Sequence, residues 1–437
     1  MTHVLGIELR RSAAIGSALI LAVVGALALY FAEGIAFTDG WMQLAMSQRL
    51  FLALLWPLAL AAGAWQGRRE HRWKVTELFA TTPRPVAQRM RPVILVMAAA
   101  VTVAYLVMGL AGGAWLIGTA DYLPAPFFAV TAVGVLALVA AVWLGLAIGR
   151  LLPWLITAPA LAIAGLGLLL TIPGATRPRG WLALVFSPIY EMNMPDAFAT
   201  VPGRVSAAQA IWLLALAVTG VLLYAAATWR LRVAALLPVL LGAALAITVM
   251  PHGKRVVTGA IDPVAKELVC ADQEPAVCLS RVHAGLMPEF LPSARQALTV
   301  LAALPGGPTR VHEDTTTYVP TRYAPWDPGV ALVRLDTGQD THLADPELAL
   351  GDAVAGAFTG PPGCEDAPPL GDQLAAAYWL IGTEPPADGN GAERDRAVDV
   401  WHRLKALPGS EAQAKVVALR AAALKCTPGT ALFGDAS

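Results

Sequence analysis

Seven apolar stretches occupy residues 12–250, and the pattern of the chain changes completely after them. A helix needs about 20 apolar residues to cross the hydrocarbon core of a bilayer. The stretches therefore predict seven membrane spans, of which the second and the seventh are short. The predicted spans are Ser12–Ala32, Leu50–Trp65, Val93–Thr119, Phe127–Gly149, Leu151–Ile172, Ala208–Thr228 and Val233–Met250.

The remaining residues, 251–437, predict a separate soluble domain that is long enough to bury its own core. Thr309–Val319 and Val330–Leu335 are rich in β-branched residues and predict strands. Apolar residues at helical spacing predict helices elsewhere. These helices are Ala284–Leu304, Leu370–Ile381, Arg394–Leu407 and Glu411–Lys425. The fold class expected for the whole chain is a polytopic α-helical membrane protein with a C-terminal soluble α+β domain.

Composition and charge agree with this division. Hydrophobic residues make up 57% of the chain and charged residues 14%, which is too apolar for an ordinary soluble protein. Residues 1–250 hold 16 Lys+Arg against 8 Asp+Glu, whereas residues 251–437 hold 15 against 23. The formal net charge of zero therefore conceals +8 in the apolar half and −8 in the tail. The acidity of the tail is typical of a solvated surface, and recruitment of a cationic substrate is the alternative interpretation.

The distribution of basic residues predicts the orientation. With a cytoplasmic N-terminus, twelve Lys and Arg residues of the apolar half lie in inner loops and four in outer loops. The four outer ones are Arg49, Arg177, Arg179 and Arg204. Positive charge accumulates on the cytoplasmic side of membrane proteins. We therefore expect a multi-pass protein of the plasma membrane, with a retained first helix and an extracytoplasmic C-terminal domain.

All four cysteines lie in the tail, as an oxidising compartment permits. Four cysteines allow three pairings. We favour Cys270–Cys278, which closes a short loop, and Cys364–Cys426, which ties the last helix to a loop rich in proline and glycine. A zinc site is disfavoured because Cys270, Cys278 and His283 lack the spacing of zinc ligands.

Motifs for chemistry are missing. His312–Glu313–Asp314 invites a metallopeptidase interpretation, but Thr316 stands where the second histidine is needed. His283, His342 and His402 are scattered, and we expect them at the surface or the edge of the core. Neither a GxSxG elbow nor a phosphate-binding GxxxxGK[ST] loop occurs. No catalytic, cofactor or metal site is expected in this chain, and no nucleic-acid partner.

The basic loop Gly67–Pro92 is the segment with the strongest indication of function. Glu70 and Lys74 are spaced to support a helix, Leu78 lies on its apolar face, and Pro83 ends it. This pattern predicts a short amphipathic helix along the inner membrane surface. Its basic residues either fix the topology and contact anionic membrane lipid, or form a docking helix for a cytoplasmic partner.

A family resemblance bears on this choice. Glu8–Arg11 before the first helix, and a loop that runs into Glu77–Leu78 and Thr82–Pro83 after the second, resemble the permeases of ABC-2 type transporters over residues 5–230. In that family this loop forms a coupling helix that sits in a cleft of the ATPase subunit. The resemblance implies the coupling positions Gly67, Arg69, Glu70, Trp73, Glu77, Leu78 and Pro83.

The same resemblance implies an external gate. The segment Trp181–Phe198 lies between the fifth and sixth spans, where these permeases place an external re-entrant element. The gate residues it implies are Trp181, Phe186, Tyr190 and Glu191. The implied organisation is a six-span ABC-2-like permease domain at 1–230, a seventh transmembrane helix at 231–250 and a disulfide-containing extracytoplasmic domain at 251–437. The seventh helix and the tail depart from the usual permease, and resemble an actinobacterial type with an added C-terminal domain.

The leading hypothesis is therefore the transmembrane subunit of an ABC transporter. Its substrate would be amphipathic or hydrophobic, such as a lipid, a peptide or an antibiotic, moved by export. ATP and Mg²⁺ would bind to a separate ATPase subunit, and a second permease copy or a paralogue would complete the complex. The alternative is a membrane-anchored receptor or assembly protein that transports nothing and whose outer domain binds a ligand. An outer-surface enzyme ranks third, because the catalytic constellation is missing.

Overall fold

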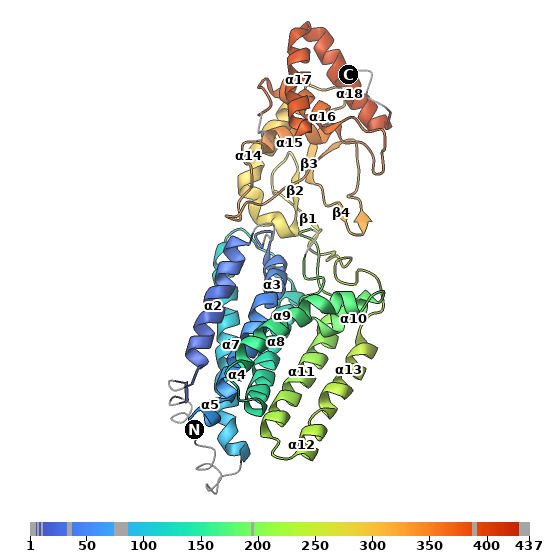
Figure 1. Cartoon of the computed structure of the whole chain (residues 1–437). Coiled ribbons are helices and arrows are strands. Elements are labelled where there is room, and N and C mark those ends of the chain that lie inside the picture. The colour runs from blue at the N-terminus through green and yellow to red at the C-terminus, as the bar shows by residue number, and fades with distance from the viewer. Residues whose placement is uncertain are drawn as a thin grey trace. The chain divides into compact units, whose positions relative to one another are not determined.

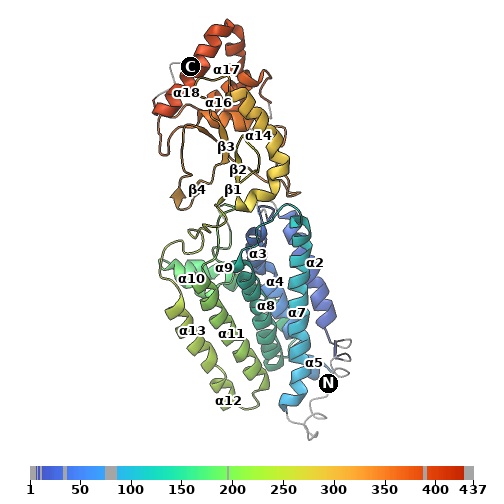
Figure 2. The ribbon, with the colours of Figure 1, turned by 180° about the vertical axis from the view of Figure 1, so that it is seen from behind.

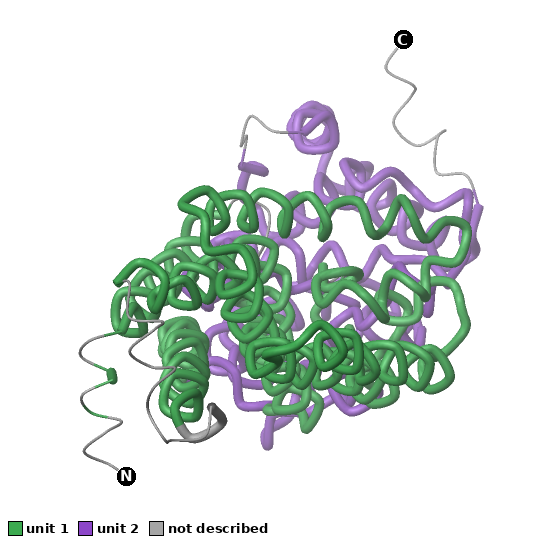
Figure 3. Tube along the Cα trace, turned by 60° about the horizontal axis from the view of Figure 1, so that its bottom comes forward, with its two compact units in different colours: residues 1–117, 123–262 green, residues 118–122, 263–437 purple. Residues whose placement is uncertain are grey.

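The structure is a computed structural model that describes residues 6, 8–9, 12–32, 37–73, 86–193, 196–386 and 391–427, with the backbone alone at 86–88. The chain forms two compact units, each with its own core (Figure 3). The helical unit comprises Met1–Ile117 and Leu123–Asp262, and the tail unit comprises Gly118–Tyr122 and Pro263–Ser437. Residues 251–262, which the sequence placed in the tail domain, belong to the helical unit.

The helical unit contains six helical segments that are long and apolar enough to cross a membrane, within the residues described. Their exposed faces carry leucine, isoleucine, valine and aromatic side chains, as expected of helices surrounded by lipid. The segments are α2 (Ala14–Phe31), α7 (Val86–Leu116), α8 (Ala125–Leu151), α9 (Thr157–Ala175), α11 (Gly203–Ala225), and α12 (Trp229–Ala234) with α13 (Leu237–Val249).

A seventh apolar segment is broken. Helix α3 (Trp41–Leu50) and helix α4 (Leu52–Gly67) meet at Phe51 with a bend of 50°. The predicted second span, Leu50–Trp65, corresponds closely to α4, whereas α3 was not predicted. The short helix α5 (Arg69–Arg72) follows α4 directly. Figures 1 and 2 show α5 and α12 at one end of the unit and α10 (Gly180–Phe186) at the other.

Helices α4 and α8 approach each other through two facing GxxxG motifs. Gly63 and Gly67 lie on α4, and Gly145 and Gly149 lie on α8. A Cβ added at Gly63 or at Gly145 would lie 2.1 Å from a backbone oxygen of the other helix. Only glycine permits this separation, and close backbone approach is a principal source of helix association in a membrane. The contact joins α4 and α8 into one body.

The tail unit is built around a sheet with strand order β1-β2-β3-β6. Strands β1 and β2 are antiparallel, whereas β2, β3 and β6 are parallel. Strands β4 and β5 form a separate antiparallel pair. The strands are β1 (Leu268–Cys270), β2 (Val277–Ser280), β3 (Arg310–Glu313), β4 (Thr317–Tyr318), β5 (Thr321–Arg322) and β6 (Val330–Val333).

Helices pack against this sheet to form the tail core. Val277, Val311 and Ala331 from three strands share one buried cluster with Phe290 and Phe358. The helices are η1 (Arg281–Leu286), α14 (Met287–Leu301), α15 (Ala349–Ala355), η2 (Gly356–Phe358), α16 (Leu370–Ile381), α17 (Ala392–Ala406) and α18 (Gly409–Lys425). The α+β character expected of the tail is present. Helix α15 and strands β1 and β2 were not predicted, because each is short.

Two disulfides close the tail unit, and they are the pairs favoured from the sequence. Cys270 and Cys278 face each other across β1 and β2, so their bond joins neighbouring strands. Cys364 and Cys426 are bonded over a separation of 62 residues and fasten the end of α18 to the loop after η2. Cross-links of this kind restrict the unfolded chain and so stabilise the folded unit.

The glycine contact yields a first prediction. Replacing Gly145 by valine places a branched side chain against the backbone of α4, so the two helices must separate. We expect a loss of at least about 2 kcal/mol of stability, measured by thermal unfolding of the full chain in detergent. Gly167→Val is the matched control, because a Cβ at Gly167 on α9 meets no atom within 4 Å. Equal melting temperatures for both variants would contradict the close contact.

Candidate functional site

The most unusual group of the helical unit is the guanidinium of Arg49. This residue lies near the end of α3, next to the bend into α4, and its exposed fraction is 0%. The sequence placed Arg49 in an outer loop, so its burial is a correction. Charged side chains inside a membrane unit are costly and usually have a function, since their hydration must be replaced.

Backbone and amide oxygens surround this guanidinium. Arg49 Nη2 donates to Pro188 O at 2.7 Å and to Gln209 Oε1 at 2.9 Å. Arg49 Nε donates to Pro188 O at 3.2 Å, and Nη1 donates to Val130 O at 3.4 Å. Gln209 is itself fixed, because its Nε2 donates to Leu184 O at 2.9 Å. One side chain therefore joins α3, α8, α11 and the segment after α10. We call Arg49, Pro188, Gln209 and Val130 the arginine junction.

The positive charge of Arg49 is stabilised by the dipoles of carbonyl and amide groups, and not by a counter-ion among the residues described. Within the described residues, no carboxylate oxygen lies within 4 Å of the Arg49 guanidinium. Four hydrogen bonds to oxygen compensate part of its desolvation. Gln48 Nε2, which lies beside Gly109, and Tyr105 Oη, which lies beside Gly134, are also buried and have no hydrogen-bond partner among the residues described. Because the Arg49 guanidinium depends on acceptors from only three residues, movement of any one of the segments that carry them would disturb the junction.

The segment Trp181–Phe198, which the resemblance implies to be an external gate, lies against this junction, and we call it the external segment. Pro188 belongs to it, and Phe186 contacts Trp212 of α11 with ring centroids 5.0 Å apart. Trp181 contacts His252 with ring centroids 4.2 Å apart, and Tyr190 packs against the same apolar cluster. Phe186 thus packs against α11, Trp181 against the segment that follows α13, and Tyr190 against the apolar cluster that both helices share.

Glu191, the fourth, has a different role. Its Oε2 accepts hydrogen bonds from the backbone N–H groups of Val257 at 2.9 Å and of Thr258 at 3.3 Å. Its φ of 56° is a left-handed conformation that a residue with a side chain adopts at a cost. The two hydrogen bonds compensate for this cost and hold the external segment to the residues that follow α13.

The predicted coupling positions divide into three groups. Gly67 is part of the contact between α4 and α8, which gives it a packing role. Arg69 forms an ion pair with Glu8, while Glu70 is half-buried and Trp73 is 66% exposed. The remaining positions are Glu77, Leu78 and Pro83, which lie outside the described residues. Glu70 and Trp73 therefore lie just beyond the tightly packed α4, and we call the described residues Arg69–Trp73 the tip.

The tail unit contains a buried pair of ionisable side chains. His283 Nδ1 and Glu313 Oε1 are 2.6 Å apart, and Glu313 Oε2 accepts the backbone N–H of Ser280 at 2.7 Å. His283 was expected at the surface or the edge of the core, and the structure buries it. His312 and Glu313 alternate on β3 and so point to opposite faces. Burial lowers the pKa of His312, and the nearby Arg310 lowers it further. The hydrogen-bonded pair of His283 and Glu313 fastens η1 to the end of β3.

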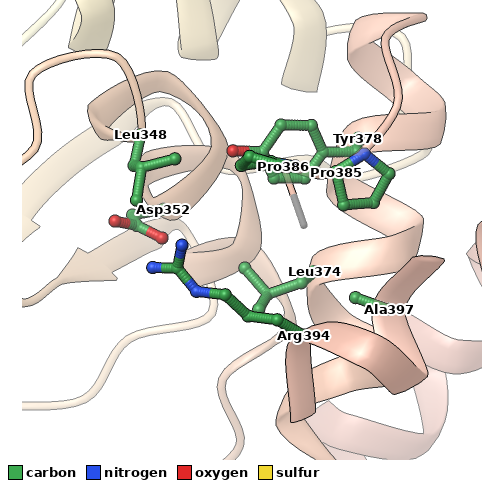
Figure 4. Close-up of a pocket in the computed structure, with 8 residues that line it drawn as sticks. All are labelled: Leu348, Asp352, Leu374, Tyr378, Pro385, Pro386, Arg394 and Ala397. Carbon is green, nitrogen blue, oxygen red and sulfur yellow. The ribbon is translucent and has the colours of Figure 1, made fainter. Parts of the chain in front are cut away.

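A small cavity lies between α15, α16 and α17 (Figure 4). Asp352 and Arg394 point toward each other at its wall, and Leu374 and Pro385 add apolar lining (Figure 4). Burial raises the pKa of Asp352 to about 6, although the positive charge of Arg394 opposes this shift. The cavity measures about 20 Å³, which is room for one water molecule. It is too small for a substrate.

Comparison with protein-family models, with curated proteins and with solved structures finds no match to this chain. Among the residues described, no three His, Cys, Asp or Glu side chains gather as metal ligands. The arginine junction, the external segment and the exposed tip after α4 are therefore the features of this chain that bear on its function.

Sequence reasoning missed Arg49 and Gln209. The signal was present in α3, where Gln43, Ser47, Gln48 and Arg49 interrupt an otherwise apolar region. All four are buried, although the sequence suggested a solvated loop. Only the fold shows that Gln43 and Arg49 find their acceptors on distant segments, at Asp196, Pro188, Val130 and Gln209.

The junction gives a second prediction. Arg49→Met leaves Pro188 O and Gln209 Oε1 without their donor in a buried site. We expect a loss of roughly 2–4 kcal/mol, because unpaired buried acceptors are costly. The measurement is thermal unfolding in detergent. Arg204→Met is the control, since Arg204 is exposed at the start of α11. A melting temperature for Arg49→Met that matches the control would refute the junction.

The raised pKa of Asp352 gives a third prediction. The folded tail binds this proton more tightly than the unfolded chain, so stability falls as pH rises from about 4 to about 6 and then levels off. In Asp352→Asn this fall disappears, and the variant gains up to about 3 kcal/mol relative to wild type across that window. Hydrogen exchange of α15 and α16 amides in the full chain measures it. Parallel profiles for the two proteins would contradict the prediction.

Proposed function

We propose that this chain is the transmembrane subunit of an ABC transporter of the ABC-2 type. A separate ATPase subunit would bind ATP and Mg²⁺ in the cytoplasm and dock on the tip after α4. A second copy of the chain, or a paralogue, would complete the complex. The N-terminus would be cytoplasmic and the tail unit extracytoplasmic, in the plasma membrane.

One observation carries this proposal, namely the continuous connection between the two ends of the helical unit. Helix α4 has 16 residues, about 24 Å at 1.5 Å per residue. At one end it runs into α5 and Trp73, and at the other it meets the bend beside Arg49. The glycine contact makes α8 move with it. A displacement of the tip would therefore reach the arginine junction and, through Pro188, the external segment.

The mechanism follows from this connection. ATP-driven closure of two ATPase subunits would push the tip and tilt α4 and α8 as one body. The hydrogen bonds of Arg49 to Pro188 and Gln209 are directional, so a tilt would strain or release the external segment. That segment would open and close the outer end of the path. Two-state packing of this kind is the usual basis of alternating access.

The exposed surface of the helical unit supports an amphipathic or hydrophobic substrate, such as a lipid, a peptide or an antibiotic. Only 17% of the most apolar stretch of α9 is buried, and the share is the same for the stretch formed by α12 and α13. Their outward faces offer apolar area to lipid, to a second copy or to a substrate that enters from the membrane. Export is the direction we propose, because the tail unit would receive the substrate outside.

A fourth prediction tests the proposed function. A tagged full chain, extracted in mild detergent from its own cells, should carry ATPase activity. Glu70→Arg/Trp73→Ala should remove at least about nine-tenths of that activity, because it inverts a charge and deletes an aromatic anchor at the tip. The control is Arg230→Gln/Trp229→Ala, which changes an exposed basic and aromatic pair on α12 at the same end.

The outcomes separate the two function classes. Activity retained by the control and lost by the tip variant supports the transporter subunit. If wild type carries no ATPase in several mild detergents, the membrane-anchored receptor or assembly protein becomes the better account. ATPase that is retained equally by both variants would place the docking surface elsewhere.

A further inference from the structure

An apolar groove of about 380 Å³ opens between α2, α4 and α9 of the helical unit. Its walls include Ile20, Leu58, Trp65 and Pro159, and the small residue Gly16 forms part of its floor. Almost all of its lining side chains are apolar. In a helical membrane unit such a groove is filled by an apolar chain, because water gains no hydrogen bonds there.

Two arginines lie over the ring of Trp65, which lines the groove. Arg68 follows directly after α4, and Arg72 is the last residue of α5. The guanidinium carbon of Arg68 lies 5.0 Å from the Trp65 ring centroid, and that of Arg72 lies 5.2 Å from it. Both positive charges are therefore held beside an aromatic side chain of the apolar groove.

The charge of these arginines is not matched by an acid within the described residues. Arg68 is only 8% exposed, its Nη1 donates to Trp154 O at 3.3 Å, and its Nε has no hydrogen-bond partner among the residues described. Glu8 forms its ion pair with Arg69 instead. Arg72 is exposed and, among the residues described, forms no ion pair, so this pair of cations favours a ligand that brings negative oxygen to Arg72 beside Arg68.

We propose that this groove binds an anionic phospholipid, with one acyl chain between α2, α4 and α9 and the phosphate on Arg68 and Arg72. The apolar groove accounts for the chain, and the unmatched arginines account for the charge. Basic pockets between transmembrane helices have the chemistry that lipid head groups require. The proposal does not depend on the transporter function, since it needs only a helical unit in a bilayer.

Native mass spectrometry of the full chain in detergent tests the site, with phosphatidylglycerol and phosphatidylcholine as the two probes. Wild type should bind phosphatidylglycerol at least about tenfold more tightly, because two arginines each favour the anionic head group. Arg68→Gln/Arg72→Gln should bind both lipids equally. Gly16→Leu should weaken both, because a Cβ at Gly16 meets no atom within 4 Å and a larger side chain enters the groove without a clash.

A matched control is the exposed basic pair of α12, changed by Arg230→Gln/Arg232→Gln, which should keep the full preference. If the buried Arg68 is needed for folding, Arg72→Gln alone should still reduce the preference about threefold or more. Equal binding of both lipids by wild type would overturn the proposal. So would an equal loss in the control, displacement by inorganic phosphate as effective as by the lipid, or a dimer whose formation excludes the lipid.

Discussion

A charge placed among apolar helices must be surrounded by oxygen acceptors, and Arg49 meets this requirement by drawing four segments to one point. Its hydrogen bonds to Pro188, Gln209 and Val130 fix the external segment, α11 and α8 against the bend between α3 and α4. None of these acceptors is charged. The junction therefore depends on geometry, because a dipole compensates for a buried charge only when it is correctly aimed.

The glycine contact between α4 and α8 connects the arginine junction to the opposite end of the helical unit. Since Gly63 and Gly145 allow backbone to approach backbone, α4 and α8 pack closely against each other. Under the proposed mechanism, this pair of helices transmits a displacement of the tip to the bend beside Arg49. The proposed lipid site also involves α4, so bound lipid would act on the same pair.

The sequence predicted most of the helices and few of the contacts. Long apolar runs such as that of α8 are predictable as helices, because a helix satisfies all backbone hydrogen bonds of such a segment in an apolar medium. Leu370–Ile381 was predicted with the bounds of α16 because its apolar spacing is regular. Helix α3 was missed because four polar residues interrupt its apolar sequence, and the burial of Arg49 among them depends on partners 81 to 160 residues away. The residues His283 and Glu313 likewise meet only in the folded tail.

The candidate site was predicted in the same uneven way. The family resemblance implied Trp181, Phe186 and Tyr190 as parts of one gate segment, which stays a prediction, whereas Arg49, which donates to Pro188, was assigned to an outer loop. Periodicity reports which residues face an apolar medium, but it does not report which polar groups satisfy one another inside it. A lone arginine beside glutamines is ambiguous until the acceptors around it are known.

The central claim is that Arg49 holds the external segment to the body formed by α4 and α8. Hydrogen exchange of residues 186–193 in the full chain, compared between wild type and Arg49→Met, tests it most directly. The account predicts faster exchange of these amides in the variant, while the amides of α4 and α8 keep their protection. Unchanged exchange in residues 186–193, or an equal rise throughout the helical unit, would contradict it.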